Sequence, residues 1–169
     1  INEEHRAVRE TAALFDVSHM GIIDVSGEDA INFLDIVSTN YVKRIKIGES
    51  QYTYLLDPEG NVLDDIMIYR RDLNRYMLVC NAINEEKVWR WLNAVNSKEF
   101  LIDKDYPEKE IEGKVMIKNL KDSSSGREQK VDIALQGPKS LAILQKIAKN
   151  RELQEKLAKI KRNKFIEEE

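Results

Sequence analysis

The sequence has few of the residues on which disulfide, metal and membrane chemistry depend. Its 169 residues include one cysteine, Cys80, and two histidines. A lone cysteine excludes an internal disulfide, and the shortage of both residue types argues against a Cys/His metal site. No apolar run approaches the roughly 20 residues of a membrane-spanning helix. The composition therefore favours a globular protein of a reducing compartment, with neither a metal centre nor a membrane partner.

The chain also lacks a large excess of positive or negative charge. The chain has 27 Lys and Arg against 30 Asp and Glu, for a formal net charge of −3. This balance provides no broad basic field, so nucleic acid is not the favoured partner. The chain contains no Walker loop and no dinucleotide-binding glycine fingerprint, and its histidines lack the partnered motif of a hydrolase triad.

Three strands joined by short turns predict an antiparallel meander. The strands are expected at residues 51–56, 62–69 and 76–81, with "DPEGN" and "RDLN" as their connections. In the first turn, Gly60 or Asn61 can take the positive φ that such turns require. Because short turns join antiparallel neighbours, residues 62–69 should form the middle strand.

Apolar spacing and capping residues place the other elements. Ser26 and Asn84 are predicted helix caps, and Pro138 suits the first residue of a helix. The polar segment "DSSSG" is expected to be a mobile loop, and the charged residues around it a solvated face. The order of elements predicts an α+β domain with a ferredoxin-like antiparallel sheet and packed helices. The predicted helices cover residues 2–15, 26–38, 84–95, 138–148 and 151–162, and the further strands cover 21–25, 114–120 and 131–137.

Two adjacent carboxylates interrupt the middle strand, "NVLDDIMIY". Alternation places Asp64 and Asp65 on opposite faces, and a buried ionised carboxylate needs a partner. Asp65 shares its face with Met67 and Tyr69, which together would suit a flat ligand that bears N–H groups. The alternative is that Asp65 lies at a strand edge, where it caps a turn or meets an arginine. Asp64 is expected to be structural, paired with an arginine or with the backbone.

Two neighbours of these acids are further candidates. Asn81 ends the next strand, and its amide both donates and accepts, so it could bind the edge of a heterocycle. The more ordinary interpretation is that Asn81 satisfies a turn. Tyr52 lies on the neighbouring strand, and ordinary core packing is the alternative to a ligand role.

Several stretches resemble one family in order and spacing. "EEHRAVRETAALFDVSHMG", "YTYLLDPEGNVLDDIMIY", "YMLVCNAIN" and "IALQGPKS" are similar to the aminomethyltransferase family, the T-protein of the glycine cleavage system. The resemblance runs from Ile1 to about Lys149 and corresponds to the first half of a family member. It implies that residues 1–169 are a folate-binding N-terminal portion, without the family's first segment and its C-terminal half.

The resemblance implies a reaction, partners and a site. Family members move a methylene group from the aminomethyl-lipoyl arm of H-protein to tetrahydrofolate and release ammonia. Tetrahydrofolate would be the co-substrate, lipoylated H-protein the protein partner, and no metal is implied. The location would be the prokaryotic cytoplasm or the mitochondrial matrix. The functional aspartate matches Asp65, and the residues at folate-lining positions are Met20, Tyr52, Met67, Tyr69 and Asn81.

One departure from the family and two alternative functions accompany this resemblance. The family has a Gly-Gly turn where this chain has Gly60-Asn61, and the turn is expected to survive the change. Without the C-terminal half, the chain is expected to bind folate weakly. The alternatives are a related folate-dependent demethylase, oxidoreductase or iron–sulfur maintenance domain, and a non-catalytic folate-binding or interaction domain.

Overall fold

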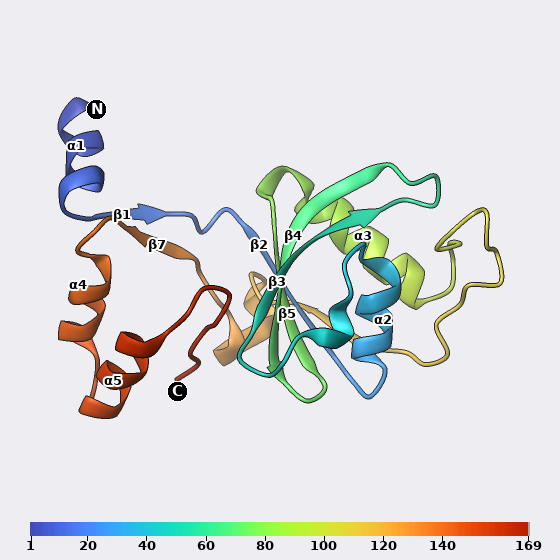
Figure 1. The fold of residues 1–169 in the computed structure, drawn as a ribbon. Coiled ribbons are helices and arrows are strands. Elements are labelled where there is room, and N and C mark those ends of the chain that lie inside the picture. The colour runs from blue at the N-terminus through green and yellow to red at the C-terminus, as the bar shows by residue number, and fades with distance from the viewer. Residues whose placement is uncertain (169) are drawn as a thin grey trace. The chain divides into compact units, whose positions relative to one another are not determined.

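The computed structural model describes residues 1–168, which fall into two compact units (Figure 1). One unit is the continuous segment Met20–Lys130. The other combines Ile1–His19 with the residues from Val131 onward. No helix in the described part of the chain is long and apolar enough to cross a membrane.

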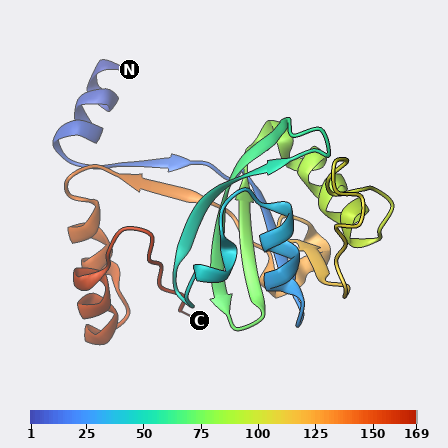
Figure 2. The same ribbon diagram turned by 45° about the vertical axis from the view of Figure 1, so that its right-hand side comes forward.

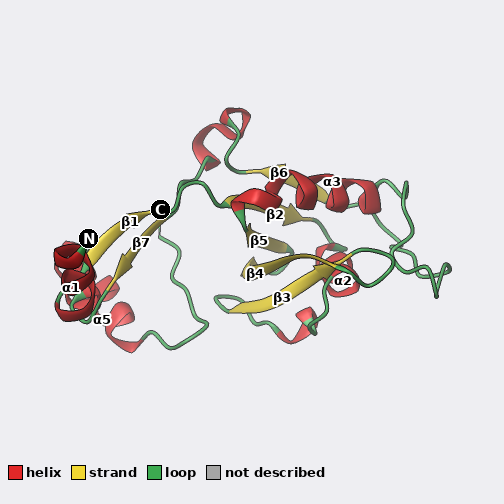
Figure 3. Cartoon of the chain, turned by 90° about the horizontal axis from the view of Figure 1, so that it is seen from above, coloured by secondary structure: helices red, strands yellow, loops and turns green. Residues whose placement is uncertain are grey.

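The unit Met20–Lys130 is built on a five-stranded sheet in the order β3-β4-β5-β2-β6 (Figure 3). All of its neighbouring strands are antiparallel, and β3, β4 and β5 form the predicted meander. The order β4-β5-β2-β6 is that of a ferredoxin-like sheet, with β3 added at one edge, which confirms the predicted fold class. The strands are β2 (Gly21–Ser26), β3 (Ser50–Leu56), β4 (Val62–Asp72), β5 (Arg75–Cys80) and β6 (Met116–Asn119).

Helices α2 (Ala30–Val37) and α3 (Glu85–Asn96) lie on one side of this sheet (Figure 2). Their apolar residues form one buried cluster with the strands, because every second strand residue points to this side. Examples are Phe33 of α2, Leu92 of α3 and Ile66 of β4, each at most 1% exposed. On the opposite face of the sheet, Tyr52, Tyr54 and Asp65 of strands β3 and β4 are exposed.

The second unit contains a two-stranded antiparallel ribbon and three helices. Strands β1 (Ala13–Asp16) and β7 (Ile133–Gln136) pair with each other. None of the described residues in this unit is buried, and several of its apolar side chains are largely exposed. Its helices are α1 (Asn2–Glu10), α4 (Ser140–Ile147) and α5 (Arg151–Lys159).

Several predicted boundaries were wrong, each for a local reason. The first helix ends at Glu10 rather than Phe15, because residues 13–16 pair with β7. Ser26 is the last residue of β2, and α2 begins three residues after Gly27, with Asp29 at its N-cap. Pro138 precedes α4, whose N-cap is Lys139.

The polar segment predicted as a loop contains 3₁₀ turns. Residues Ser123–Glu128, labelled η3, form 3₁₀ turns interrupted by a kink at Gly126, whose φ is 57°, and the Asp122 carboxylate accepts a hydrogen bond of 2.7 Å from the Ser124 N–H. The Ser125 hydroxyl is buried and donates to the carbonyl of Asn119 at 2.6 Å. These local contacts attach η3 to the end of β6. The run of serines in the sequence does not by itself predict them.

Candidate functional site

The two adjacent carboxylates of β4 point to opposite faces of the sheet, as strand alternation predicts. Asp64 lies on the helix-covered face and is 2% exposed, whereas Asp65 lies on the open face and is exposed. The predicted difference between the two acids is therefore present in the structure.

Asp64 is paired with N–H groups of two asparagines, and one of these is a backbone N–H, so the expected backbone partner is present whereas the hydrogen bonds described for Asp64 include no arginine. Its Oδ2 accepts the backbone N–H of Asn81 at 2.9 Å. Its Oδ1 accepts the side-chain Nδ2 of Asn81 at 2.9 Å and that of Asn84 at 2.6 Å. Asn84 occupies the N-cap position of α3, as predicted, but its side chain contacts Asp64 instead of capping the helix. Asp64 thus fixes the turn that joins β5 to α3.

Asp65 is held on both of its oxygens by neighbouring side chains. Asn81 Nδ2 donates to Asp65 Oδ1 at 2.9 Å, and the Tyr52 hydroxyl donates to Oδ2 at 3.0 Å. Each carboxylate oxygen has further lone pairs, so both can still accept a hydrogen bond from a ligand. Asp65 therefore combines a fixed orientation with access from solvent.

Two tyrosines form an aromatic wall beside Asp65. The rings of Tyr52 and Tyr54 meet edge to face, with centroids 5.4 Å apart, and their hydroxyls are 3.4 Å apart. The pKa of Tyr52 is raised above its ordinary value, first by the hydrogen bond with Tyr54, then by desolvation and by the hydrogen bond with Asp65. The Tyr52 hydroxyl thus keeps its proton and donates a hydrogen bond to Asp65. Tyr52 is 47% exposed, so core packing does not account for it.

The strand register assembles the remaining candidates around this wall. Met67 pairs with Tyr52 on one side and Val79 on the other, and Tyr69 pairs with Met77. Because paired residues share a face, Met67 and Tyr69 lie on the open face with Asp65, and both are half-buried. The open face of β3, β4 and β5 around these residues, from here on the platform, carries Tyr, Met and Val side chains.

Met20 and Asn81 approach the platform at the end that carries Asp65. Gly21 pairs with Cys80, so Met20 and Asn81 immediately flank this pair. Asn81 lies just beyond β5, not within it as predicted, and its carbonyl accepts the Asn84 N–H at 2.9 Å. Asn81 therefore satisfies a turn, as the more ordinary interpretation expects, and it also contacts Asp65. Its role toward a ligand stays a prediction.

Tyr54 and Asn84 are the neighbours that sequence reasoning missed. Tyr54 is two residues from Tyr52 on the same strand, and alternation alone could have placed it beside Asp65. The bond from Asn84 to Asp64 joins residues 20 positions apart, and no local pattern indicates it.

The turn before the paired acids is formed as expected, despite its departure from Gly-Gly. Gly60 has a φ of +85°, and Asn61 does not have a positive φ. Asp57 closes the turn by accepting the N–H groups of Glu59 and Asn61 and the side chain of Asn61, at 2.8–3.0 Å. These bonds hold the pKa of Asp57 below its ordinary value, the Asn61 side chain contributing most. Asn61 thus stabilises the turn through a side-chain hydrogen bond to Asp57, without needing the positive φ that glycine tolerates.

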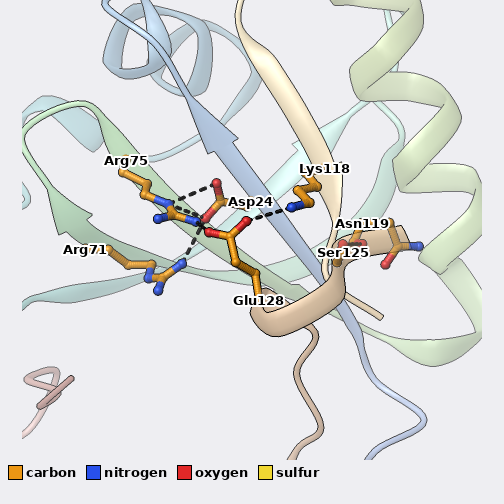
Figure 4. A network of polar contacts seen from close by, with 7 residues as sticks. All are labelled: Asp24, Arg71, Arg75, Lys118, Asn119, Ser125 and Glu128. Atoms are coloured by element: carbon orange, nitrogen blue, oxygen red, sulfur yellow. Dashed lines mark hydrogen bonds and ion pairs between the residues drawn. The ribbon is translucent and has the colours of Figure 1, made fainter. Parts of the chain in front are cut away.

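A network of charges joins side chains of the sheet strands to η3 (Figure 4). Asp24 of β2, which is 3% exposed, accepts hydrogen bonds from Arg71 and Arg75, both at 3.0 Å. Glu128 of η3 also contacts Arg75, and it accepts a bond of 2.6 Å from Lys118. Lys118 and Glu128, which were predicted to lie on a solvated face, therefore take part in ion pairs, and Glu128 ties η3 to β5 and β6.

Glu128→Gln is expected to weaken the acid dependence of stability. Lys118 and then Arg75 lower the pKa of Glu128 from 4.5 to about 2. A carboxyl group whose pKa is lower in the folded state than in the unfolded state stabilises the fold at pH values above its unfolded-state pKa. This contribution is lost as the pH falls from 4.5 towards 2. Urea unfolding across that window should show a smaller loss of stability in Glu128→Gln than in the exposed control Glu108→Gln. Identical pH dependence in the two variants would contradict this role.

The fold and the site define a class of protein, namely an α+β domain in which one sheet face carries an oriented carboxylate beside aromatic side chains. The model of the GCVT N-terminal domain family matches residues 1–167, so the chain belongs to that family. The resemblance to the aminomethyltransferases of glycine cleavage is thereby confirmed.

Individual relatives agree with this assignment. Aminomethyltransferases of Symbiobacterium thermophilum and Bacillus subtilis are each 40% identical to this chain, over 146 and 147 residues. These matches cover 86% and 87% of the chain but 34% and 35% of the relatives. The glycine cleavage system aminomethyltransferase T from Bartonella henselae has a TM-score of 0.69 and 31% identity, over 88% of this chain and 36% of that one. The chain thus spans about a third of the length of these proteins.

Proposed function

We propose that the full-length protein carrying this chain is a tetrahydrofolate-dependent aminomethyltransferase of glycine cleavage. It would take the methylene group of an aminomethyl-lipoyl arm on H-protein and transfer it to tetrahydrofolate. The observation that carries the proposal is the Asp65 carboxylate, which is exposed on the platform and held by Tyr52 and Asn81. Membership in the GCVT N-terminal domain family and the aminomethyltransferase relatives support it.

The proposed reaction balances without an oxidant or a reductant. The methylene carbon loses its bonds to the lipoyl sulfur and to the amino nitrogen, and it gains bonds to two folate nitrogens. The two protons released from those nitrogens match the protons needed by the lipoyl sulfur and by the departing ammonia. The step is therefore a group transfer that depends on proton placement and on stabilisation of a developing cation.

The residues of the platform fit specific parts of this task. Asp65 can accept an N–H of the folate, orient the nitrogens and stabilise the positive charge that develops on the methylene group in an iminium-like state. The tyrosine and methionine side chains offer a surface for the flat pterin and aminobenzoyl rings. Met20 and Asn81 would border the end at which the carboxylate lies.

Calorimetric titration with tetrahydrofolate tests whether the pterin site lies within these residues. We expect the 169-residue chain to show weak but saturable binding that falls further in Asp65→Ala. Glu59→Ala is the matched control, because it removes an exposed carboxylate from the β3–β4 turn rather than from the platform. Absence of binding by the unmodified chain, or equal loss in both variants, would contradict the assignment of the site to the platform.

A further inference from the structure

We propose that Asp64 is a positioning residue for Asp65, acting through the side-chain amide of Asn81. The inference rests on the proposed function, since it assigns a role in the reaction to a buried acid that cannot itself touch a ligand on the platform. It also explains why two carboxylates are adjacent in β4: one is presented to the ligand, and the other determines how the first is held.

The contacts of Asp64 leave one orientation for the Asn81 amide. An ionised carboxylate only accepts hydrogen bonds, so the group facing Asp64 must be the NH₂ and not the carbonyl of that amide. Nδ2 of Asn81 lies 2.9 Å from Asp64 Oδ1, and the backbone N–H of Asn81 lies 2.9 Å from Oδ2. Two bonds from one residue to both oxygens fix the position and the rotation of Asn81.

The same amide nitrogen then reaches Asp65. Nδ2 of Asn81 is 2.9 Å from Asp65 Oδ1 and 3.2 Å from the Asp65 carbonyl oxygen. With the amide turned over, its oxygen would face two carboxylates and a carbonyl, all of which are acceptors. Asp64 thus ensures that Asn81 donates to Asp65, while Tyr52 fixes the second oxygen from the opposite side.

Because Asp64 is buried, its carboxylate depends on the asparagine donors around it. Asp64 is 2% exposed, so water cannot replace a donor lost from its surroundings, whereas Asp65 is exposed. In Asp64→Asn, the new NH₂ group must face either the Asn81 backbone N–H or the two side-chain amides. Each choice sets donor against donor, and we expect the Asn81 side chain to move away or turn over.

Steady-state kinetics of the full-length protein test the proposal. Asp64→Asn is expected to lower kcat about 10- to 100-fold with little change in the KM for tetrahydrofolate, as is typical when an orienting partner is lost. Asn84→Ala is the matched control, because it removes another donor to Asp64, and none of the hydrogen bonds described for Asn84 reaches Asp65. We expect Asn84→Ala to lower stability and to leave kcat within about twofold.

A double-mutant cycle separates action through Asn81 from a general structural effect. If Asp64 acts through that amide, Asp64→Asn should reduce kcat little further once Asn81→Ala is present. Additive losses of kcat in the double variant, or a loss in Asn84→Ala equal to that in Asp64→Asn, would overturn the proposal.

An NMR measurement keeps the inference independent of the reaction. With asparagine labelled by ¹⁵N, the Asn81 NH₂ signals, identified by their absence in Asn81→Ser, should show slow exchange with solvent. They should lose this protection in Asp64→Asn and retain it in Asn84→Ala. Retained protection in Asp64→Asn would overturn the positioning role. Protection that behaves as expected in a protein without transfer activity would instead refute the proposed function alone.

Discussion

Asp65→Asn is expected to reduce methylene transfer by the full-length protein about 100-fold or more. The substitution keeps the size of the side chain but removes the charge that would stabilise a developing cation. A single such electrostatic group is worth about 3–4 kcal/mol in the transition state, or 10²–10³ in rate. Because Asp65 is exposed, the free energy of unfolding should change by less than about 1 kcal/mol.

The measurement is single-turnover transfer from aminomethyl-lipoyl H-protein, together with urea unfolding of the same samples. Glu59→Gln serves as control, because it neutralises an exposed acid on the neighbouring turn. Near-normal transfer in Asp65→Asn would refute the role assigned to this carboxylate. A loss of rate accompanied by an equally large loss of stability would show that the residue acts on the fold.

Gly21→Ala is expected to cause the largest loss of stability among single substitutions near the site. Gly21 is the last residue of "SHMG" and the first of β2, where it pairs with Cys80. A Cβ at this position would lie 2.5 Å from the Cys80 sulfur and 2.8 Å from Cγ of Glu85. Both neighbours are fixed by a strand and by the start of α3, so we expect a cost of about 2–3 kcal/mol from overpacking.

Cys80 itself provides the readout for this substitution. Burial, and then the nearby charges of Asp64 and Glu85, raise the pKa of the Cys80 thiol to about 12. The buried thiol should therefore react with a thiol reagent only when the chain opens, and labelling should be much faster in Gly21→Ala. Gly60→Ala is the control for backbone strain without crowding. Its φ is positive, which disfavours alanine, but the added Cβ would meet no atom within 4 Å. Equal labelling rates in the unmodified chain and Gly21→Ala would contradict the predicted crowding.

The parts of the fold that depend on local periodicity were predictable from the sequence. Alternation in β4 placed Asp64 and Asp65 on opposite faces of the sheet, and turn residues identified the meander. Because apolar residues occur on both faces of β4, alternation alone did not show which face the helices cover. The first predicted helix was too long, because the pairing of β1 with β7 joins residues more than a hundred positions apart. The helix propensity of residues 2–15 contains no information about β7, the strand with which residues 13–16 pair.

The contacts that orient the site were not predictable in the same way. Asn81 was a candidate on its position, but its bonds to both Asp64 and Asp65 depend on where β4 and β5 end relative to each other. The charge network of Asp24, Arg75 and Glu128 likewise joins two strands to η3, across 51 and 53 positions of sequence. Such contacts follow from strand register, which no single segment determines.

The insertion of residues 20–130 between β1 and β7 has a consequence for the order in which the chain folds. In an unfolded chain, pairing these two strands would close a loop of about 100 residues. Within the folded insert, Ile22 accepts the Leu120 N–H and Leu120 accepts the Lys130 N–H, both at 2.8 Å, so the two ends of the insert already lie side by side. The effective loop then shrinks about tenfold, which lowers its entropic cost by about 2 kcal/mol. The ribbon should therefore form after the five-stranded sheet.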